Sequence, residues 1–195
     1  PAKSQRLLLG DAGGSHANLT DEYAAIPREM CAAASALGAQ VLRFADEGTF
    51  YRQLPTLRRR IGDRAALRAM HFFDENRRAG QEAEALRAGD MTAFVSLMRE
   101  SCASSELMLQ NIWPGDQGQE RSVALALALS ARILAGKGGA WRVHGGGFAG
   151  TIQALVPQNL AAEYMETMNG FMNNPTACRG IGIRPVGGYA LKGGK

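Results

Sequence analysis

The stretch Trp141–Pro157, which reads WRVHGGGFAGTIQALVP, decides the fold. Four glycines occupy six positions between Gly145 and Gly150, and β-type residues flank them on both sides. Residues 141–144 and 151–156 therefore predict two strands joined by a glycine loop. The loop matches G-x-G-x-x-G, but a dinucleotide-binding fold needs a helix after that motif, where this chain predicts a strand. Two interpretations stay open: a tight hairpin connection, or a backbone nest that binds an anion or admits another backbone.

The composition indicates a folded chain whose glycines gather toward one end. The 195 residues are 46% hydrophobic, which is enough for a packed core. Fourteen of the 24 glycines fall in residues 136–195, so that part is expected to contain tight turns or close approaches of the backbone. Gly136-Lys137-Gly138-Gly139 lacks the Ser or Thr that follows the lysine of a nucleotide-binding P-loop.

Charge, cysteines and hydropathy exclude several classes of protein. A net charge of +4 is too small for a dedicated nucleic-acid binder, and residues 58–60, three arginines, predict a solvated helix face. Cys31, Cys102 and Cys178 match no metal spacing and predict buried free thiols in a reducing compartment. The longest strictly apolar run, residues 123–129, is too short to span a bilayer, and no signal peptide opens the chain. We expect a cytoplasmic protein that binds neither nucleic acid nor membrane.

The rest of the chain predicts one strand and several helices before the glycine loop, and a helix and a strand after it. A buried strand is expected over residues 6–10, and an extended piece over 41–44. Helices are expected from a first turn at Pro27 to about residue 37, over 63–88, 90–112 and 122–134, and from Pro157 to about residue 169. The pairs Gly62-Asp63 and Gly89-Asp90 bracket helices because each places a stop signal before an N-cap. With a last strand over 179–185, the pattern predicts an α+β fold with an antiparallel sheet layered with helices.

Two further segments carry polar side chains. Residues 13–23 bring glycines, hydroxyls, an amide and the phenol of Tyr23 into one turn, which suits either a polyhydroxylated ligand or a helix cap. The cap does not explain Tyr23. On the 63–88 helix, His71 and Glu75 have the i, i+4 spacing of metal ligands but no third ligand, so an ion network is favoured there.

Four stretches of the chain, which follow one another in the same order as in the family, resemble the C-terminal half of galactokinases, in the GHMP kinase superfamily. Residues 141–157 are similar to the third motif of that family, with Ala149 in place of a glycine. Residues 14–23 resemble the stretch whose tyrosine helps bind the sugar. Residues 71–78 resemble the pattern His-x-x-x-Glu-Asn-x-Arg, and residues 183–188 resemble the closing strand of one bacterial branch. The resemblance covers nearly the whole chain.

The resemblance implies a GHMP-kinase C-terminal domain over residues 41–195, preceded over residues 1–40 by the end of the N-terminal domain that binds sugar and ATP. It implies transfer of the γ-phosphoryl group of ATP, with Mg²⁺, to the C1 hydroxyl of α-D-galactose, which gives galactose 1-phosphate in the Leloir pathway. Tyr23 would bind the sugar. The glycine loop would lie beside the nucleotide phosphates and brace the phosphate-binding loop. The loop residues concerned are Gly145, Gly146, Gly147, Phe148 and Gly150.

The chain departs from the family in length. Members are about twice as long, and their N-terminal half carries the catalytic arginine, the acidic sugar ligands, the phosphate loop and the proposed base. Residues 101–105 are the nearest serine cluster and lack the glycines of that loop. We therefore expect no catalytic residue and no metal ligand in this chain, the main ligands of ATP and Mg²⁺ outside it, and no activity of the chain alone.

Two alternatives stay open. One is a kinase for another sugar, such as N-acetylgalactosamine, and the other is a non-catalytic module that binds sugar, nucleotide or a partner. If half of a domain pair is missing, apolar surface is expected around the glycine loop or the Leu7 strand, either exposed or covered by a second copy in a homo-oligomer.

Overall fold

The chain folds as a four-stranded antiparallel sheet layered with helices, as its pattern predicted. The computed structural model describes residues 4–14, 19–115, 121–184 and 186. In chain order the elements are β1 (Gln5–Asp11), α1 (Thr20–Ala36), the 3-10 helix η2 (Leu42–Phe44), α2 (Glu47–Ile61), α3 (Asp63–Ala88), α4 (Met91–Ser104), the π-helix η3 (Ser105–Leu109), α5 (Ser122–Leu134), β2 (Ala140–Val143), β3 (Thr151–Pro157), the 3-10 helix η4 (Gln158–Leu160), α6 (Ala161–Phe171) and β4 (Cys178–Gly180).

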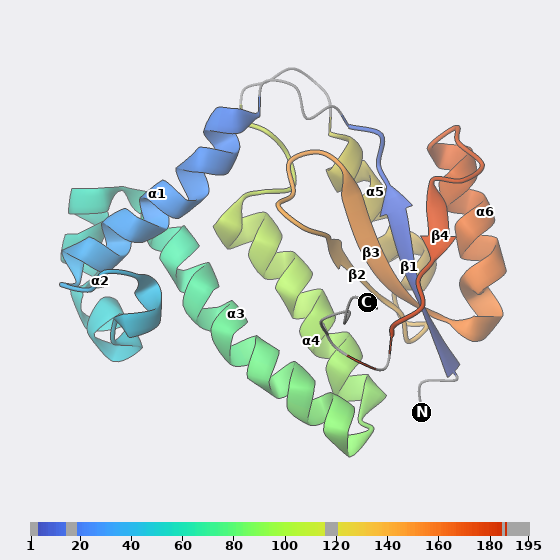
Figure 1. Cartoon of the computed structure of the whole chain (residues 1–195), viewed down its shortest axis with the longest axis horizontal. Coiled ribbons are helices and arrows are strands. Elements are labelled where there is room, and N and C mark those ends of the chain that lie inside the picture. Colours follow the sequence, from blue (N-terminus) through green and yellow to red (C-terminus); the bar gives the residue numbers. More distant parts are fainter. Residues whose placement is uncertain (1–3, 15–18, 116–120, 185, 187–195) are drawn as a thin grey trace, which may run out of the picture.

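The sheet has the strand order β2-β3-β1-β4, so the first strand of the chain lies inside it (Figure 1). Leu8 of β1 lies opposite Ala154 of β3. Because side chains alternate along a strand, the two faces of the sheet carry different clusters. Ala154 and its neighbours pack against α5 and α6, whereas the adjacent Leu155 packs against α4. The sheet is therefore covered on both faces near the β2–β3 hairpin.

A second apolar cluster joins α1, α2 and the first half of α3, apart from the sheet (Figure 1). Phe50 of α2 is completely buried and packs on Phe73 of α3, with ring centroids 5.4 Å apart. Ala33 and Ala34 of α1 complete the contact, since small side chains let the helix axes approach. Packing in this group of helices holds α1 in place, with its N-terminal end against the β2–β3 hairpin.

The helix boundaries predicted from Gly-Asp pairs are confirmed, but Asp63 is not an N-cap as predicted: it is the first residue of α3, and Gly62 holds the cap position. Gly89 ends α3 in the left-handed conformation, with φ 71°, and the Asp90 carboxylate accepts the Ala93 N–H at 2.9 Å. α5 covers the predicted residues 122–134. Gly and Asp have strong local preferences, so neighbours far along the chain do not change their effect.

Five local predictions were wrong. Cys31 is exposed rather than buried, because the buried side of α1 is formed by Ala25, Ala33 and Ala34. Pro27 lies inside α1 rather than in its first turn, because the preceding turn is also helical and begins at Thr20. Residues 42–44 form a 3-10 helix with Leu42 buried, not an extended piece. The helix after Gly89 changes to a π-helix at Ser105 and ends at Leu109. β4 has three residues, and Pro185 lies outside the described residues.

The division predicted at residue 40 stays a prediction; β1, which precedes it, shares one sheet with strands that follow it. Beside Leu7, the Ile181 N–H donates to the Leu7 carbonyl at 2.9 Å, and Ile181 is 38% exposed; that a partner covers this surface stays a prediction. At the glycine loop, in contrast, Phe148 is buried. Within the part of the chain that the structure describes, no helix combines the length and apolarity needed to cross a bilayer.

Candidate functional site

The glycine loop is the connection of the antiparallel β2–β3 hairpin. The His144 N–H donates to the Thr151 carbonyl at 2.9 Å, which closes the hairpin, and the Ala149 N–H donates to the Gly147 carbonyl at 2.7 Å. Gly145 and Gly147 have φ angles of 72° and 81°, and glycine adopts these without steric cost. The hairpin interpretation is therefore confirmed.

The loop is also approached closely by the backbone of another segment, as its glycines allowed. The Phe148 N–H donates to the main-chain carbonyl of Asn111, which follows η3. The Asn111 side-chain Nδ2 donates to the Gly146 carbonyl at 3.2 Å. A Cβ atom on Gly147 would overlap the Asn111 carbonyl oxygen, so this approach requires glycine.

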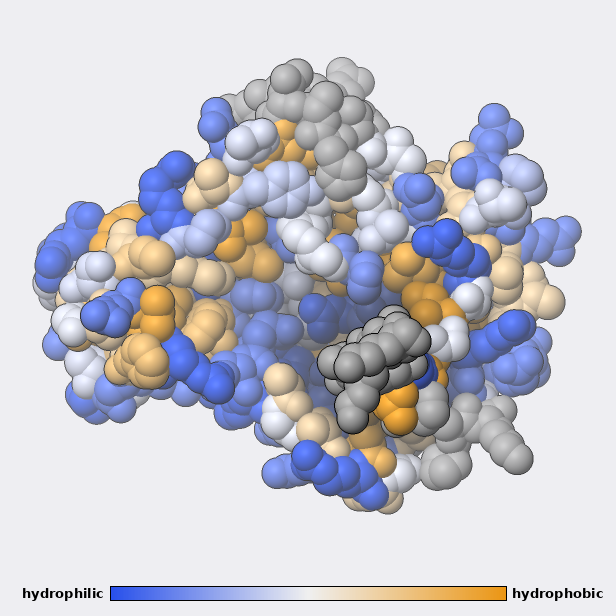
Figure 2. Space-filling model, in the orientation of Figure 1, coloured by the Kyte–Doolittle hydropathy of each residue, from blue (hydrophilic) through white to orange (hydrophobic). Residues whose placement is uncertain are grey.

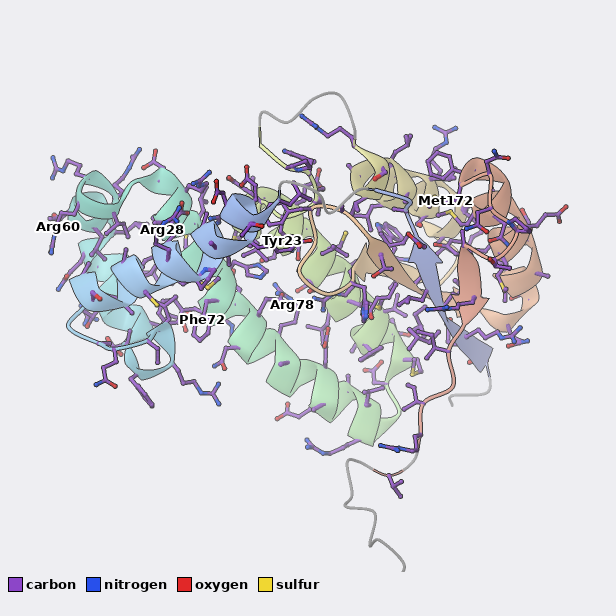
Figure 3. The ribbon with its side chains drawn as sticks, turned by 45° about the horizontal axis from the view of Figure 1, so that its top comes forward. Tyr23, Arg28, Arg60, Phe72, Arg78 and Met172 are labelled. Atoms are coloured by element: carbon purple, nitrogen blue, oxygen red, sulfur yellow. The ribbon has the colours of Figure 1, made fainter. Side chains whose placement is uncertain are left out.

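Tyr23 contacts the same loop from α1 (Figure 3). Its hydroxyl donates to the Gly147 carbonyl at 2.8 Å, and its ring meets Phe148 edge to face, with centroids 5.1 Å apart. A Cβ atom on Gly146 would lie 2.8 Å from Tyr23 Cε1. Burial raises the pKa of the Tyr23 phenol, so it is protonated at neutral pH. The structure thus brings together the two segments that were expected to bind sugar and to border the phosphates.

The turn after β1 lies against the other end of the loop. The Ala12 N–H donates to the Gly150 carbonyl at 2.7 Å, and a Cβ atom on Gly14 would lie 3.0 Å from the Cβ of Ala149. Residues 15–18 of the polar segment, including its histidine and asparagine, lie outside the described residues. The described part of the segment therefore supports the loop at Gly14 and contacts it through Tyr23.

His71 and Glu75 belong to a polar network between α3, α4 and β2. His71 Nδ1 lies 2.8 Å from Ser104 Oγ, and burial lowers the pKa of His71. Glu75 pairs with Arg78 and accepts the Ser101 hydroxyl at 2.8 Å. No three His, Cys, Asp or Glu side chains gather as metal ligands in the described ranges. The ion network predicted for Glu75 is confirmed, while His71 pairs with a hydroxyl.

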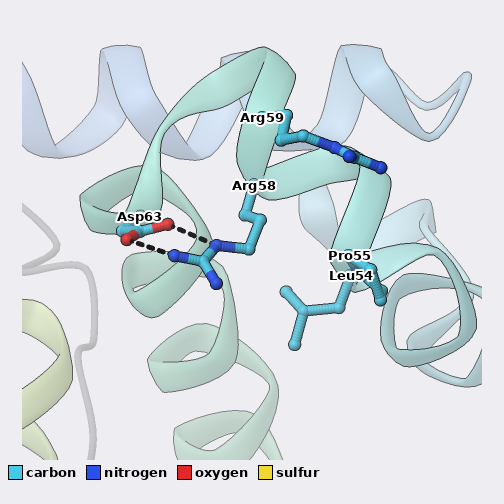
Figure 4. Close-up of a pocket in the computed structure, with 5 residues that line it drawn as sticks. All are labelled: Leu54, Pro55, Arg58, Arg59 and Asp63. Carbon is cyan, nitrogen blue, oxygen red and sulfur yellow. Dashed lines mark hydrogen bonds and ion pairs between the residues drawn. The ribbon is translucent and has the colours of Figure 1, made fainter.

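Other hollows lie away from the loop. Figure 2 shows a hollowed, largely hydrophilic area between the helical group and the sheet. A separate hollow of about 620 Å³ lies between α2 and α3 and is lined by Leu54, Pro55, Arg58, Arg59 and Asp63 (Figure 4). Arg58 there is bound by Asp63 through two hydrogen bonds of 2.7 Å. None of the contacts described above for the glycine loop involves a residue that lines this hollow.

Sequence patterns missed two residues that hold the site. Asn111 was placed inside a helix, although it lies beyond η3 against the loop. Arg68, 1% exposed, donates to the Leu109 carbonyl at 3.1 Å and to Glu29 at 2.9 Å. No local signal marks either residue, because both act on partners that are distant in the sequence.

No family model matches the chain. The galactokinase of Glaesserella parasuis serovar 5 is 31% identical over 188 residues, which are 92% of this chain and 47% of that protein. The galactokinase of Mycobacterium tuberculosis is 33% identical over 163 residues, 83% of this chain and 41% of that protein. The chain is thus similar to galactokinases over most of its length. It spans about half the length of the curated galactokinases that it matches.

A solved galactokinase has the same fold. The crystal structure of Lactococcus lactis galactokinase complexed with galactose matches 91% of this chain and 45% of that chain, with a TM-score of 0.68 and 22% identity. The expected GHMP-kinase fold class is therefore confirmed. The roles expected for Tyr23 and for the glycine loop stay predictions.

Proposed function

We propose that this chain is part of a sugar kinase that transfers the γ-phosphoryl group of ATP to the C1 hydroxyl of α-D-galactose. The contact between the Tyr23 hydroxyl and the Gly147 carbonyl carries the proposal. It joins the segment expected at the sugar to the loop expected beside the phosphates, and phosphoryl transfer requires the two substrates to be held next to each other. The similarity to galactokinases over nine-tenths of the chain supports it.

Tyr23 has a defined capacity toward a sugar. A phenol donates one hydrogen bond and also accepts through its oxygen. The Tyr23 hydroxyl donates to the Gly147 carbonyl, so the hairpin fixes the direction of the phenol that we propose to contact the sugar.

Two N–H groups of the glycine loop are already bonded within the protein. The N–H groups of Phe148 and Ala149 donate to carbonyls within the protein, and no cluster of three acidic, histidine or cysteine side chains is present in the described ranges. A phosphate-binding nest needs several N–H groups that converge on the anion. We propose that the glycine loop braces a phosphate-binding loop supplied by the rest of the whole protein.

An ADP-release assay tests the proposal in two forms of the protein. The 195-residue chain alone is expected to show no galactose-dependent turnover. A chimera that joins it to the part of the Glaesserella parasuis galactokinase that it does not match is expected to phosphorylate galactose. In that chimera Tyr23→Phe is expected to lower kcat/KM by about fivefold, because the loss of one hydrogen bond is worth about 1 kcal/mol.

Tyr51→Phe is the matched control, since Tyr51 lies on α2 and packs on Phe50. It is expected to leave kcat/KM unchanged. A folded chimera that turns over N-acetylgalactosamine instead would favour the alternative sugar kinase. A folded chimera that turns over neither sugar would contradict the kinase and favour a non-catalytic binding module.

A further inference from the structure

Asn111 reaches the hairpin from a distorted stretch of backbone. The α-helical hydrogen-bond pattern of α4 gives way to the π-helix η3 at Ser105. Gln110 then adopts the left-handed conformation, with φ 59° and ψ 50°, which is costly for a residue with a Cβ atom. π-turns and left-handed non-glycine residues concentrate at functional sites. Here the distortion delivers Asn111 to the loop.

Asn111 holds the loop through its main chain and its side chain together. Its carbonyl accepts the Phe148 N–H, and its Nδ2 donates to Gly146. Asn111 is 2% exposed. Its Oδ1 is buried and has no hydrogen-bond partner among the residues described. A buried acceptor without a partner lowers stability, so stability alone does not account for an amide at this position.

Asn111 acts on Tyr23 through the two glycines between them. The Gly146 carbonyl accepts a hydrogen bond from the Asn111 side-chain amide, and Gly146 also lies against the Tyr23 ring. Gly147 accepts the Tyr23 hydroxyl and passes so close to the Asn111 carbonyl that no side chain fits. A displacement of this dipeptide therefore moves both partners of the Tyr23 phenol.

A second set of contacts joins α1, which carries Tyr23, to η3, which precedes Asn111. Arg68 of α3 donates to Leu109, the last residue of η3, and to Glu29 of α1. α1 carries Tyr23, and the segment after η3 carries Asn111. The contacts thus form a closed ring from α1 through the hairpin, Asn111, η3 and Arg68 back to α1.

We propose that Asn111 is a positioning residue that sets the direction of the Tyr23 phenol through Gly146 and Gly147. The identity of the recognised group, a galactose hydroxyl, rests on the proposed function. The positioning itself is a property of the ligand-free chain. Replacement of the Asn111 amide is expected to release Gly146 and to let the Tyr23 ring reorient.

The test uses the full 195-residue chain with ¹³C-labelled tyrosine, and Tyr23→Phe assigns the Tyr23 resonance. Asn111→Ala is expected to shift that resonance in the ligand-free protein and to raise hydrogen exchange at the Phe148 amide at least tenfold. Asn111→Asp keeps the shape but places an oxygen against the Gly146 carbonyl, so a larger shift is expected. Ser130→Ala is the matched control: the Ser130 hydroxyl is buried and bonds to Tyr164, away from the loop.

The outcomes separate positioning from general stability. If Asn111→Ala leaves the Tyr23 resonance at its wild-type position, the proposal is overturned, and the same holds if Ser130→Ala shifts it equally at equal loss of thermal stability. If Asn111→Asp does not fold, the alanine variant decides. In the chimera described above, a Tyr23 resonance that does not respond to millimolar galactose counts against the proposed function alone, since the ligand-free spectra of the 195-residue chain still judge Asn111.

Discussion

Gly147 is the loop residue at which a side chain is excluded for two reasons. Its φ of 81° disfavours a Cβ atom, and that atom would overlap the Asn111 carbonyl. Gly147→Ala is expected to lower the free energy of unfolding by about 3 kcal/mol or more, from strain of the left-handed conformation and from overpacking. Urea denaturation measures the change.

Gly145 supplies the control for this prediction. Its φ is 72°, but a Cβ atom there would meet nothing within 4 Å. Gly145→Ala is therefore expected to cost only about 1 kcal/mol, the price of the left-handed conformation itself. Equal losses for the two variants would show that the approach of Asn111 is unimportant.

Two buried thiols predict how stability depends on alkaline pH. Burial raises the pKa of Cys102 and of Cys178 to about 11, from an ordinary value of 9. The unfolded chain then loses these protons near pH 9, while the folded chain keeps them to about pH 11. The free energy of unfolding is therefore expected to be unaffected by these thiols below pH 9 and to fall between pH 9 and 11.

Urea denaturation as a function of pH checks this prediction. The double variant Cys102→Ala, Cys178→Ala is expected to be less stable at pH 7 and to show a shallower decline between pH 9 and 11. Cys31→Ser is the control, because Cys31 is exposed, and it is expected to leave the decline unchanged. An identical decline in the double variant would rule out the thiols as its source.

At the scale of elements, Arg68 joins α1 to η3 more strongly than its neighbour Arg64. Both guanidinium groups bind Glu29, but the Arg68 side chain is 1% exposed and that of Arg64 is 50% exposed. Arg68→Met is expected to cost about 3 kcal/mol, since it leaves a partly buried carboxylate and the Leu109 carbonyl without this donor. Arg64→Met is expected to cost less than about 1 kcal/mol.

A double-mutant cycle with Glu29→Gln checks the pair. A coupling energy between Arg68 and Glu29 that clearly exceeds that between Arg64 and Glu29 is expected. Thermal unfolding of the single and double variants supplies the values. Equal coupling at the two arginines would contradict the idea that burial of Arg68 makes it the principal link between α1 and η3.

The sequence patterns predicted those elements that short-range preferences control. Gly89-Asp90 ended one helix and began the next, and the residues on either side of the glycine loop formed paired strands. The patterns failed where distant contacts decide. Pro27 is a good first-turn residue, yet α1 extends back to Thr20, which places Leu19 and Tyr23 against the hairpin.

The site was predictable only in part. Tyr23 and the glycine loop could be found because each resembles a motif of a known family. Asn111 could not, because the pattern placed it near the end of a helix predicted over residues 90–112. Its role depends on the change to a π-helix at Ser105, and helix propensities do not distinguish an α-helix from a π-helix.

At the scale of the whole molecule, this chain carries one side of the proposed site and an exposed apolar strip. Ile181, Ile183 and Val186 follow β4 and are more than a third exposed. Isolated apolar residues are common on protein surfaces, but neighbouring ones mark contact regions. These neighbouring side chains therefore mark a candidate contact region.

The central place of β1 in the sheet governs the order in which the molecule can assemble. β1 precedes its partners Thr151–Pro157 and Cys178–Gly180 in the sequence, so it can pair only after most of the described residues have been made. Helices such as α3 need only local contacts, and long-range pairing is slower because a large loop must close. Pulsed hydrogen exchange during refolding is expected to protect α3 amides before those of β1; simultaneous protection would mean that the sheet nucleates folding.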